Sequence, residues 1–111
     1  MTETKIKLVE AQKRLGAFAK ATPELFSGFS RVSKVATTAG SFSSAQKELI
    51  AVAVAVAKGC EDCILYHLDG AIKHGATEAD LIEALEVTVE MGGGPAVMYG
   101  AKALDAFRNL S

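Results

Sequence analysis

The longest uninterrupted apolar run of the chain is Leu49–Ala57, which has nine residues. Ser43 and Gln46 precede it at the spacing of a capping box, and Gly59 follows it, so a helix is predicted over residues 44–58. A helix that is apolar on every side has to be buried on every side. A chain of 111 residues offers few such positions, so we expect part of this helix to contact another subunit.

Cap and turn residues divide the rest of the chain into further helices. Thr22 and Pro23 are typical of the end of one helix and the start of the next, and Thr77 with Asp80 marks another start. No strand-like alternation or internal repeat is present. The fold class is therefore predicted to be all-α, a single-domain helical bundle of about six helices over residues 1–111. The expected helices span residues 3–21, 23 to before Gly40, 44–58, 60–74, 77 to before Gly92, and 96–110.

Charge and hydropathy exclude several classes of protein. Twelve Lys and Arg residues against 13 Asp and Glu residues give a net charge of −1, which argues against a nucleic-acid partner. The longest apolar run is about half of the ~18 residues that indicate a membrane span. No basic segment leads into an apolar run at the N-terminus, so we expect no signal peptide and a cytoplasmic protein. In that compartment a close cysteine pair favours catalysis or metal binding over a permanent disulfide.

The two cysteines of the chain, Cys60 and Cys63, are followed by His67. At roughly 100° per residue, a helix places these three side chains within an arc of about 60°. The N-terminal turn of a helix lowers the pKa of a thiol, and an imidazole one turn away can take its proton. The negative charges of Glu61 and Asp62 act in the opposite direction. The pattern favours redox chemistry at a thiol pair, without a metal or a cofactor.

Other interpretations of the same residues stay open at this point. Cys60 and Cys63 could be two small buried side chains. They could also be half of a zinc site in a non-catalytic binding or interaction module, with His67 as a third ligand. Structural zinc has four ligands, so Glu48 or a partner chain would have to supply the fourth. Glu48 by itself is typical of a solvated acid that complements the helix dipole.

The spacing Glu48, eleven residues, Cys60, two residues, Cys63, three residues, His67 closely resembles that of the carboxymuconolactone decarboxylase superfamily, in particular its alkyl hydroperoxidase D-like branch. The similarity continues through Gly75–Leu81 and further along the chain, and it covers roughly residues 23 to 107. The resemblance implies an all-α fold that assembles into trimers or hexamers. It also implies a cysteine-based peroxidase and disulfide reductase.

By this resemblance, Cys63 is the thiol that attacks the peroxide and Cys60 is the resolving thiol. His67 and Glu48 then form a proton relay, which replaces the solvated role of Glu48. The implied partners are a hydroperoxide substrate and a dithiol reductant, either a protein or a lipoyl-type group. The peroxidase members carry a second histidine just before the second cysteine, where this chain has Asp62, so the relay would lack that group. A lyase of the decarboxylase type is a further alternative, although members with that activity generally lack the cysteine pair.

Overall fold

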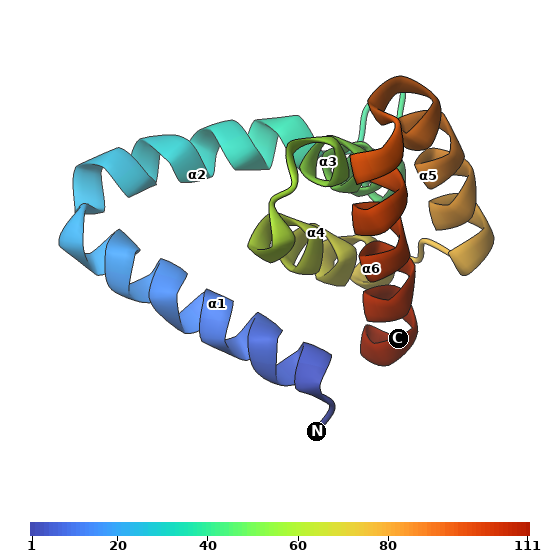
Figure 1. Cartoon of the computed structure of the whole chain (residues 1–111). Coiled ribbons are helices and arrows are strands. Elements are labelled where there is room, and N and C mark those ends of the chain that lie inside the picture. The colour runs from blue at the N-terminus through green and yellow to red at the C-terminus, as the bar shows by residue number, and fades with distance from the viewer.

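The computed structural model describes residues 1–111 and contains six α-helices and no strand (Figure 1). The predicted all-α fold class is confirmed. None of the helices has the length and apolar character needed to cross a membrane. In chain order they are α1 (Glu3–Ala21), α2 (Pro23–Thr37), α3 (Ser44–Lys58), α4 (Glu61–Lys73), α5 (Glu78–Gly92) and α6 (Gly94–Leu110).

Local hydrogen bonds explain where the helices begin and end. Ser43 and Gln46 form the predicted capping box of α3, and Thr77 forms a second one with Asp80 at the start of α5. Gly59 ends α3 with a φ of 71°, a left-handed conformation that glycine adopts without a steric penalty. These boundaries agree with the predicted ones because each depends on residues that are neighbours in the sequence.

Several boundaries differ from the predicted ones. α5 continues through Gly92, which was expected to lie beyond its end. α2 ends at Thr37, before Gly40 is reached, and Thr38 is already extended. α6 begins at Gly94 instead of Ala96, because its first turn accommodates Pro95, whose missing N–H is not needed there. α4 begins at Glu61 instead of Cys60, which is the extended N-cap residue.

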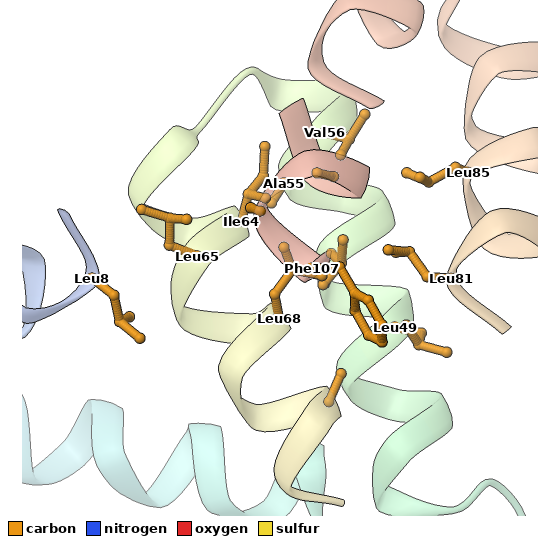
Figure 2. Packing of buried hydrophobic residues seen from close by; sticks show 14 of the residues in the cluster. Leu8, Leu49, Ala55, Val56, Ile64, Leu65, Leu68, Leu81, Leu85 and Phe107 are labelled. Atoms are coloured by element: carbon orange, nitrogen blue, oxygen red, sulfur yellow. The ribbon is translucent and has the colours of Figure 1, made fainter. Parts of the chain in front are cut away.

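The hydrophobic core lies among α3, α4, α5 and α6. α1 contributes one buried side chain, that of Leu8, and α2 contributes none. The two N-terminal helices therefore form a hairpin beside a four-helix unit, as Figure 1 shows. Figure 2 shows the core side chains of the four-helix unit gathered between these helices. The largest fully buried ones are Val52, Val56, Ile64, Leu68 and Leu81.

Within a single chain, α3 is not buried on every side as its sequence predicts. Val52 and Val56 are buried, whereas Ile50 and Val54 on the outer side are about half exposed. This outer side lines an apolar groove of about 850 Å³ together with residues of α5. The exposed side of α3 is thus consistent with the expected contact to another subunit, which stays a prediction.

An ion pair joins the start of α5 to the end of α6. The Arg108 guanidinium donates from Nε and Nη2 to the two carboxylate oxygens of Glu78, at 2.8 and 3.2 Å. These bonds hold the pKa of Glu78 below its usual value. The pKa of Asp80 is also lowered, because its carboxylate accepts a hydrogen bond from the backbone N–H of Thr77.

The two lowered pKa values predict a loss of stability in acid. A carboxyl group with a lowered folded-state pKa contributes fully to the free energy of unfolding above its unfolded pKa, and this contribution is lost as pH falls through the folded-state value. We therefore expect the urea midpoint to fall below about pH 4.5, and Glu78→Gln to reduce this pH dependence. Glu86→Gln on the same helix, which removes no ion pair, is the control. An unchanged pH dependence in Glu78→Gln would contradict the prediction.

Candidate functional site

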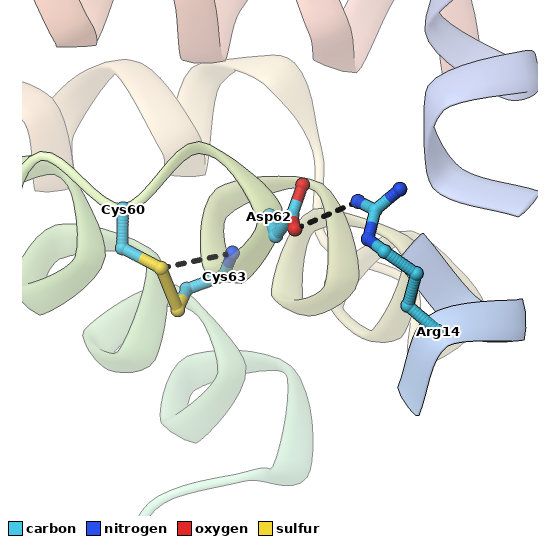
Figure 3. Close-up of a disulfide and its surroundings, with 4 residues drawn as sticks. All are labelled: Arg14, Cys60, Asp62 and Cys63. Atoms are coloured by element: carbon cyan, nitrogen blue, oxygen red, sulfur yellow. Dashed lines mark hydrogen bonds and ion pairs between the residues drawn. A yellow bond between two sulfur atoms is a disulfide. The ribbon is translucent and has the colours of Figure 1, made fainter. Parts of the chain in front are cut away.

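The N-terminal end of α4 positions the two sulfur atoms. Cys60 is the N-cap residue, and its Sγ accepts a hydrogen bond from the backbone N–H of Cys63 at 3.3 Å. Cys63 lies in the first turn, where backbone N–H groups are not used within the helix. The two side chains are joined in a disulfide (Figure 3), with their Cα atoms 5.3 Å apart. The structure thus presents the oxidised form of the pair.

Cys63 and His67 line the same cavity, which lies between α1, α2 and α4 and has a volume of about 620 Å³. Cys63 is exposed, whereas Cys60 is partly buried and is not part of the cavity lining. The larger groove between α3 and α5 contains neither a thiol nor an imidazole. The reactive groups therefore favour the smaller cavity as the candidate site. Its walls include Phe18, Phe26, Phe29, Tyr66, Arg14 and Lys34.

The imidazole of His67 forms a hydrogen bond with the carboxylate of Glu48. The Nδ1 atom of His67 lies 2.9 Å from Oε1 of Glu48, which is in the second turn of α3. Glu48 is only 7% exposed, so its interpretation as a solvated acid is wrong. A carboxylate can only accept, so Nδ1–H donates and Nε2 is left for proton exchange. The Tyr66 ring stands edge-on to the imidazole, with ring centres 5.2 Å apart.

Gly70, a residue that was not among the predicted site residues, makes room for the Glu48 carboxylate. A Cβ atom at position 70 would overlap Oε2 of Glu48. The absence of a side chain on this face of α4 therefore allows the carboxylate to lie beside the helix and reach His67. A glycine in the interior of a predicted helix signals a close approach of this kind, although it does not say which group approaches.

The acidic residues beside the cysteines are paired with cations from other helices. Asp62 binds Arg14 of α1 at 2.9 Å (Figure 3), and Glu61 lies 3.4 Å from Lys7 and 3.6 Å from Lys102 of α6. The pKa of Lys7 is raised, chiefly by its hydrogen bond with Glu61. These exposed pairs contribute little to stability. They do offset the negative charge that would otherwise disfavour a thiolate at the helix end.

The remaining candidate features lie apart from this arrangement. His74 is the exposed C-cap residue of α4. Of the three glycines before Pro95, Gly92 ends α5, Gly93 connects the two helices and Gly94 begins α6, and none of them lines either of the two cavities described above. No group of three or more His, Cys, Asp or Glu side chains is positioned to hold a metal ion. The structure therefore places Cys60, Cys63 and His67 together at the start of α4, as their spacing predicted, and brings Glu48 of α3 against His67, as the family resemblance implied, while the individual roles of these residues stay predictions.

Comparison with known proteins identifies a family and relatives that this chain resembles. The sequence model of the carboxymuconolactone decarboxylase family matches residues 23–106. An uncharacterised protein of Cupriavidus necator is 48% identical over 110 residues, which are 99% of this chain and 97% of that protein.

Two crystal structures of carboxymuconolactone decarboxylase family proteins have a similar fold. The protein from Legionella pneumophila, in its apo form, has a TM-score of 0.93 and 42% identity, with 98% of this chain and 97% of that chain covered. The protein from Thermotoga maritima, for which a role in antioxidative response has been suggested, has a TM-score of 0.82 and 25% identity. That match covers 94% of this chain and 89% of the other.

Replacement of Gly70 by alanine tests how closely Glu48 and α4 are packed. We expect Gly70→Ala to destabilise the protein by about 1–3 kcal/mol, because the buried carboxylate must move. The control is Gly16→Ala in the interior of α1, where a Cβ would meet no atom within 4 Å. That change should stabilise the helix by about 0.5–1 kcal/mol. Urea unfolding measures both effects, and nitrogen NMR of the His67 ring reports the loss of its bond. Equal stability changes in the two variants would contradict the assignment.

Proposed function

This chain belongs to the carboxymuconolactone decarboxylase family, and from that premise we propose that it is a thiol-dependent peroxidase or disulfide oxidoreductase that reduces alkyl hydroperoxides. One observation carries the proposal. The exposed Cys63, in the first turn of α4, shares a cavity with His67, whose Nδ1 is bonded to the buried carboxylate of Glu48. A nucleophile, a base and a group that orients the base are the elements of nucleophilic catalysis.

The reaction starts from the reduced pair. The thiol of Cys63 gives its proton to Nε2 of His67, and the helix end favours the resulting thiolate. The thiolate attacks the terminal oxygen of the hydroperoxide, so an S–O bond forms and the O–O bond breaks. The departing alkoxide takes the proton from the imidazolium and leaves as an alcohol. Cys63 is then a sulfenic acid.

Cys60 completes the oxidative half of the cycle. Its sulfur attacks the sulfenic sulfur of Cys63, an S–S bond forms, and the hydroxyl group leaves as water after taking the thiol proton of Cys60. The product is the disulfide present in the structure. A dithiol reductant, a protein or a lipoyl-type group, then exchanges with this disulfide, is itself oxidised to a disulfide, and restores both thiols. The exposure of Cys63 supports its role as the sulfur that external partners reach.

Glu48 acts on the reaction through His67. Its carboxylate fixes the ring by accepting from Nδ1–H and stabilises the imidazolium that forms when Nε2 takes a proton. Asp62 holds Arg14 at the position where the peroxidase members carry a second histidine. The relay of this chain therefore consists of His67 and Glu48. The suggested antioxidative role of the Thermotoga maritima protein supports the same class of reaction, and the cysteine pair favours it over a decarboxylase-type lyase.

The distinct roles of the two cysteines are tested with single variants. Reduced protein mixed with cumene hydroperoxide should consume one peroxide per chain and lose both thiols. Cys63→Ser should consume none, because the attacking sulfur is absent. Cys60→Ser should consume one peroxide and stop at a sulfenic acid, which dimedone traps and mass spectrometry detects. Survival of both thiols in the wild-type protein, with the peroxide intact, would refute the proposed function.

The two histidines of the chain provide a matched test of the base. We expect His67→Gln to slow thiol oxidation about 100-fold, since general-base catalysis by a positioned side chain contributes at least that much. His74→Gln should leave the rate unchanged, because His74 is exposed at the far end of α4. Stopped-flow measurement of peroxide consumption by reduced protein gives both rates. Similar rates in the two variants would exclude His67 from the relay.

A further inference from the structure

The cavity of Cys63 is apolar at the end near the turn between α1 and α2. Phe18 and Phe26 stand four residues before and four residues after Thr22, which separates the two helices, and both line the cavity. Figure 1 shows the two helices diverging from this turn toward α4. The cavity volume of about 620 Å³ is within the range of small-molecule pockets, about 300–1,000 Å³. The end near the turn is therefore suited to a hydrocarbon group.

The reacting sulfur lies farther from the turn than these two rings. Arg14 binds Asp62, the residue before Cys63, at 2.9 Å. Arg14 is four residues before Phe18, and at 1.5 Å per residue this places it about 6 Å farther from the turn along α1. The contact of Arg14 with Asp62 thus marks the level at which Cys63 faces the cavity. A ligand whose hydrocarbon end contacts the rings extends past this level toward the wider end.

Lys34 lines the same cavity at a level still farther from the turn. It follows Phe26 by eight residues on α2, which corresponds to about 12 Å along the helix axis. Its ammonium group forms no ion pair within the chain, whereas Arg14, the other cation of the lining, is paired. Ser30 and Ser33 of α2 also line the cavity, and their hydroxyl groups can donate to an anion. The wider end therefore carries a cation without a counter-ion.

The larger groove between α3 and α5 has the opposite charge. The charged residues of its lining are Asp80 and Glu83, so it disfavours an anionic ligand. Only the cavity of Cys63 combines aromatic rings with an unpaired cation among the two. An apolar ligand with one negative group is the class that matches this combination.

We infer that the substrates are hydroperoxides of long-chain carboxylic acids, with the carboxylate on Lys34, the hydrocarbon end between Phe18 and Phe26, and the peroxy group between these two ends, at Cys63. The inference rests on the proposed function and names the substrate class of that site. The thiolate takes the terminal oxygen, so an S–O bond forms and the O–O bond breaks, and the alkoxide takes the proton of the His67 imidazolium. The products are a hydroxy acid and a sulfenic acid on Cys63. Lys34 selects and orients the substrate without taking part in the bond changes.

The test compares the hydroperoxide of linoleic acid with its methyl ester, which keeps the chain and lacks the charge. Stopped-flow mixing with reduced protein, below the concentration at which the acid forms micelles, gives a rate constant for each. We expect the acid to react about tenfold faster, since a hydrogen bond between charged groups contributes about that much to affinity. Lys34→Met should make the two rates nearly equal, and Lys34→Arg should keep most of the preference.

Lys20→Met is the matched control. Lys20 is exposed on α1, forms no ion pair and does not line the cavity. Its replacement changes the net charge of the chain by the same amount as Lys34→Met. We therefore expect Lys20→Met to keep the preference for the acid, because the effect belongs to the position of Lys34 and not to the total charge.

A second measurement needs no peroxide. In Cys60→Ser protein, linoleate should slow the alkylation of Cys63 by iodoacetamide, because a bound chain covers the sulfur. Methyl linoleate should need about tenfold higher concentration for the same protection. Lys34→Met should remove the difference between the two ligands.

The outcomes separate the inference from the proposed function. Equal rates for acid and ester in protein that does reduce cumene hydroperoxide overturn the inference and leave the proposed function intact. A preference for the acid that persists in Lys34→Met, or linoleate that gives Cys63 no protection, overturns it as well. Failure of the proposed function looks different, because then no hydroperoxide is consumed, cumene hydroperoxide included, and the substrate class falls with it.

Discussion

The hydrogen bond between His67 and Glu48 is the interaction on which the rest of the site depends. It joins α3 to α4 and satisfies a carboxylate that is almost completely buried. A buried charge without a partner is costly, so the pairing of the two residues matters both for packing and for the state of the imidazole. Gly70 is part of the same arrangement, because only a residue without a side chain leaves space for Glu48 at this point of α4.

The N-terminal hairpin shapes the site without contributing to most of the core. α1 buries Leu8 and α2 buries nothing, yet together they form two walls of the Cys63 cavity. α1 also supplies Arg14 and Lys7, which pair with the acidic residues next to the cysteines. The hairpin therefore supplies positive charges beside the cysteines and walls for the cavity of Cys63, whereas the cysteines themselves lie on the four-helix unit. This division explains how a small chain can present an exposed Cys63 in the same cavity as an imidazole that is bonded to a buried carboxylate.

The sequence predicted best those features that depend on near neighbours in the chain. The capping box at Ser43 and the helix start at Thr77 were correctly identified, because each depends on hydrogen bonds between residues three apart in the sequence. The start of α6 was misplaced, because a proline in the first turn is compatible with either boundary. The complete burial predicted for α3 was not found in one chain, because hydrophobicity indicates that a surface needs covering and does not say by which molecule.

The sequence by itself determined the helical fold class, the family, and the placement of Cys60, Cys63 and His67 at one end and one side of a helix, because periodicity and spacing are local properties. Only the tertiary structure decided that Glu48 is buried against His67, that Gly70 admits it, and that Arg14 neutralises Asp62. These contacts join residues on different helices, and their distances depend on how the helices pack. The apolar side chains of α2, among them Phe29 and Val32, illustrate the same limit, since their helical spacing can be seen in the sequence but their exposure cannot.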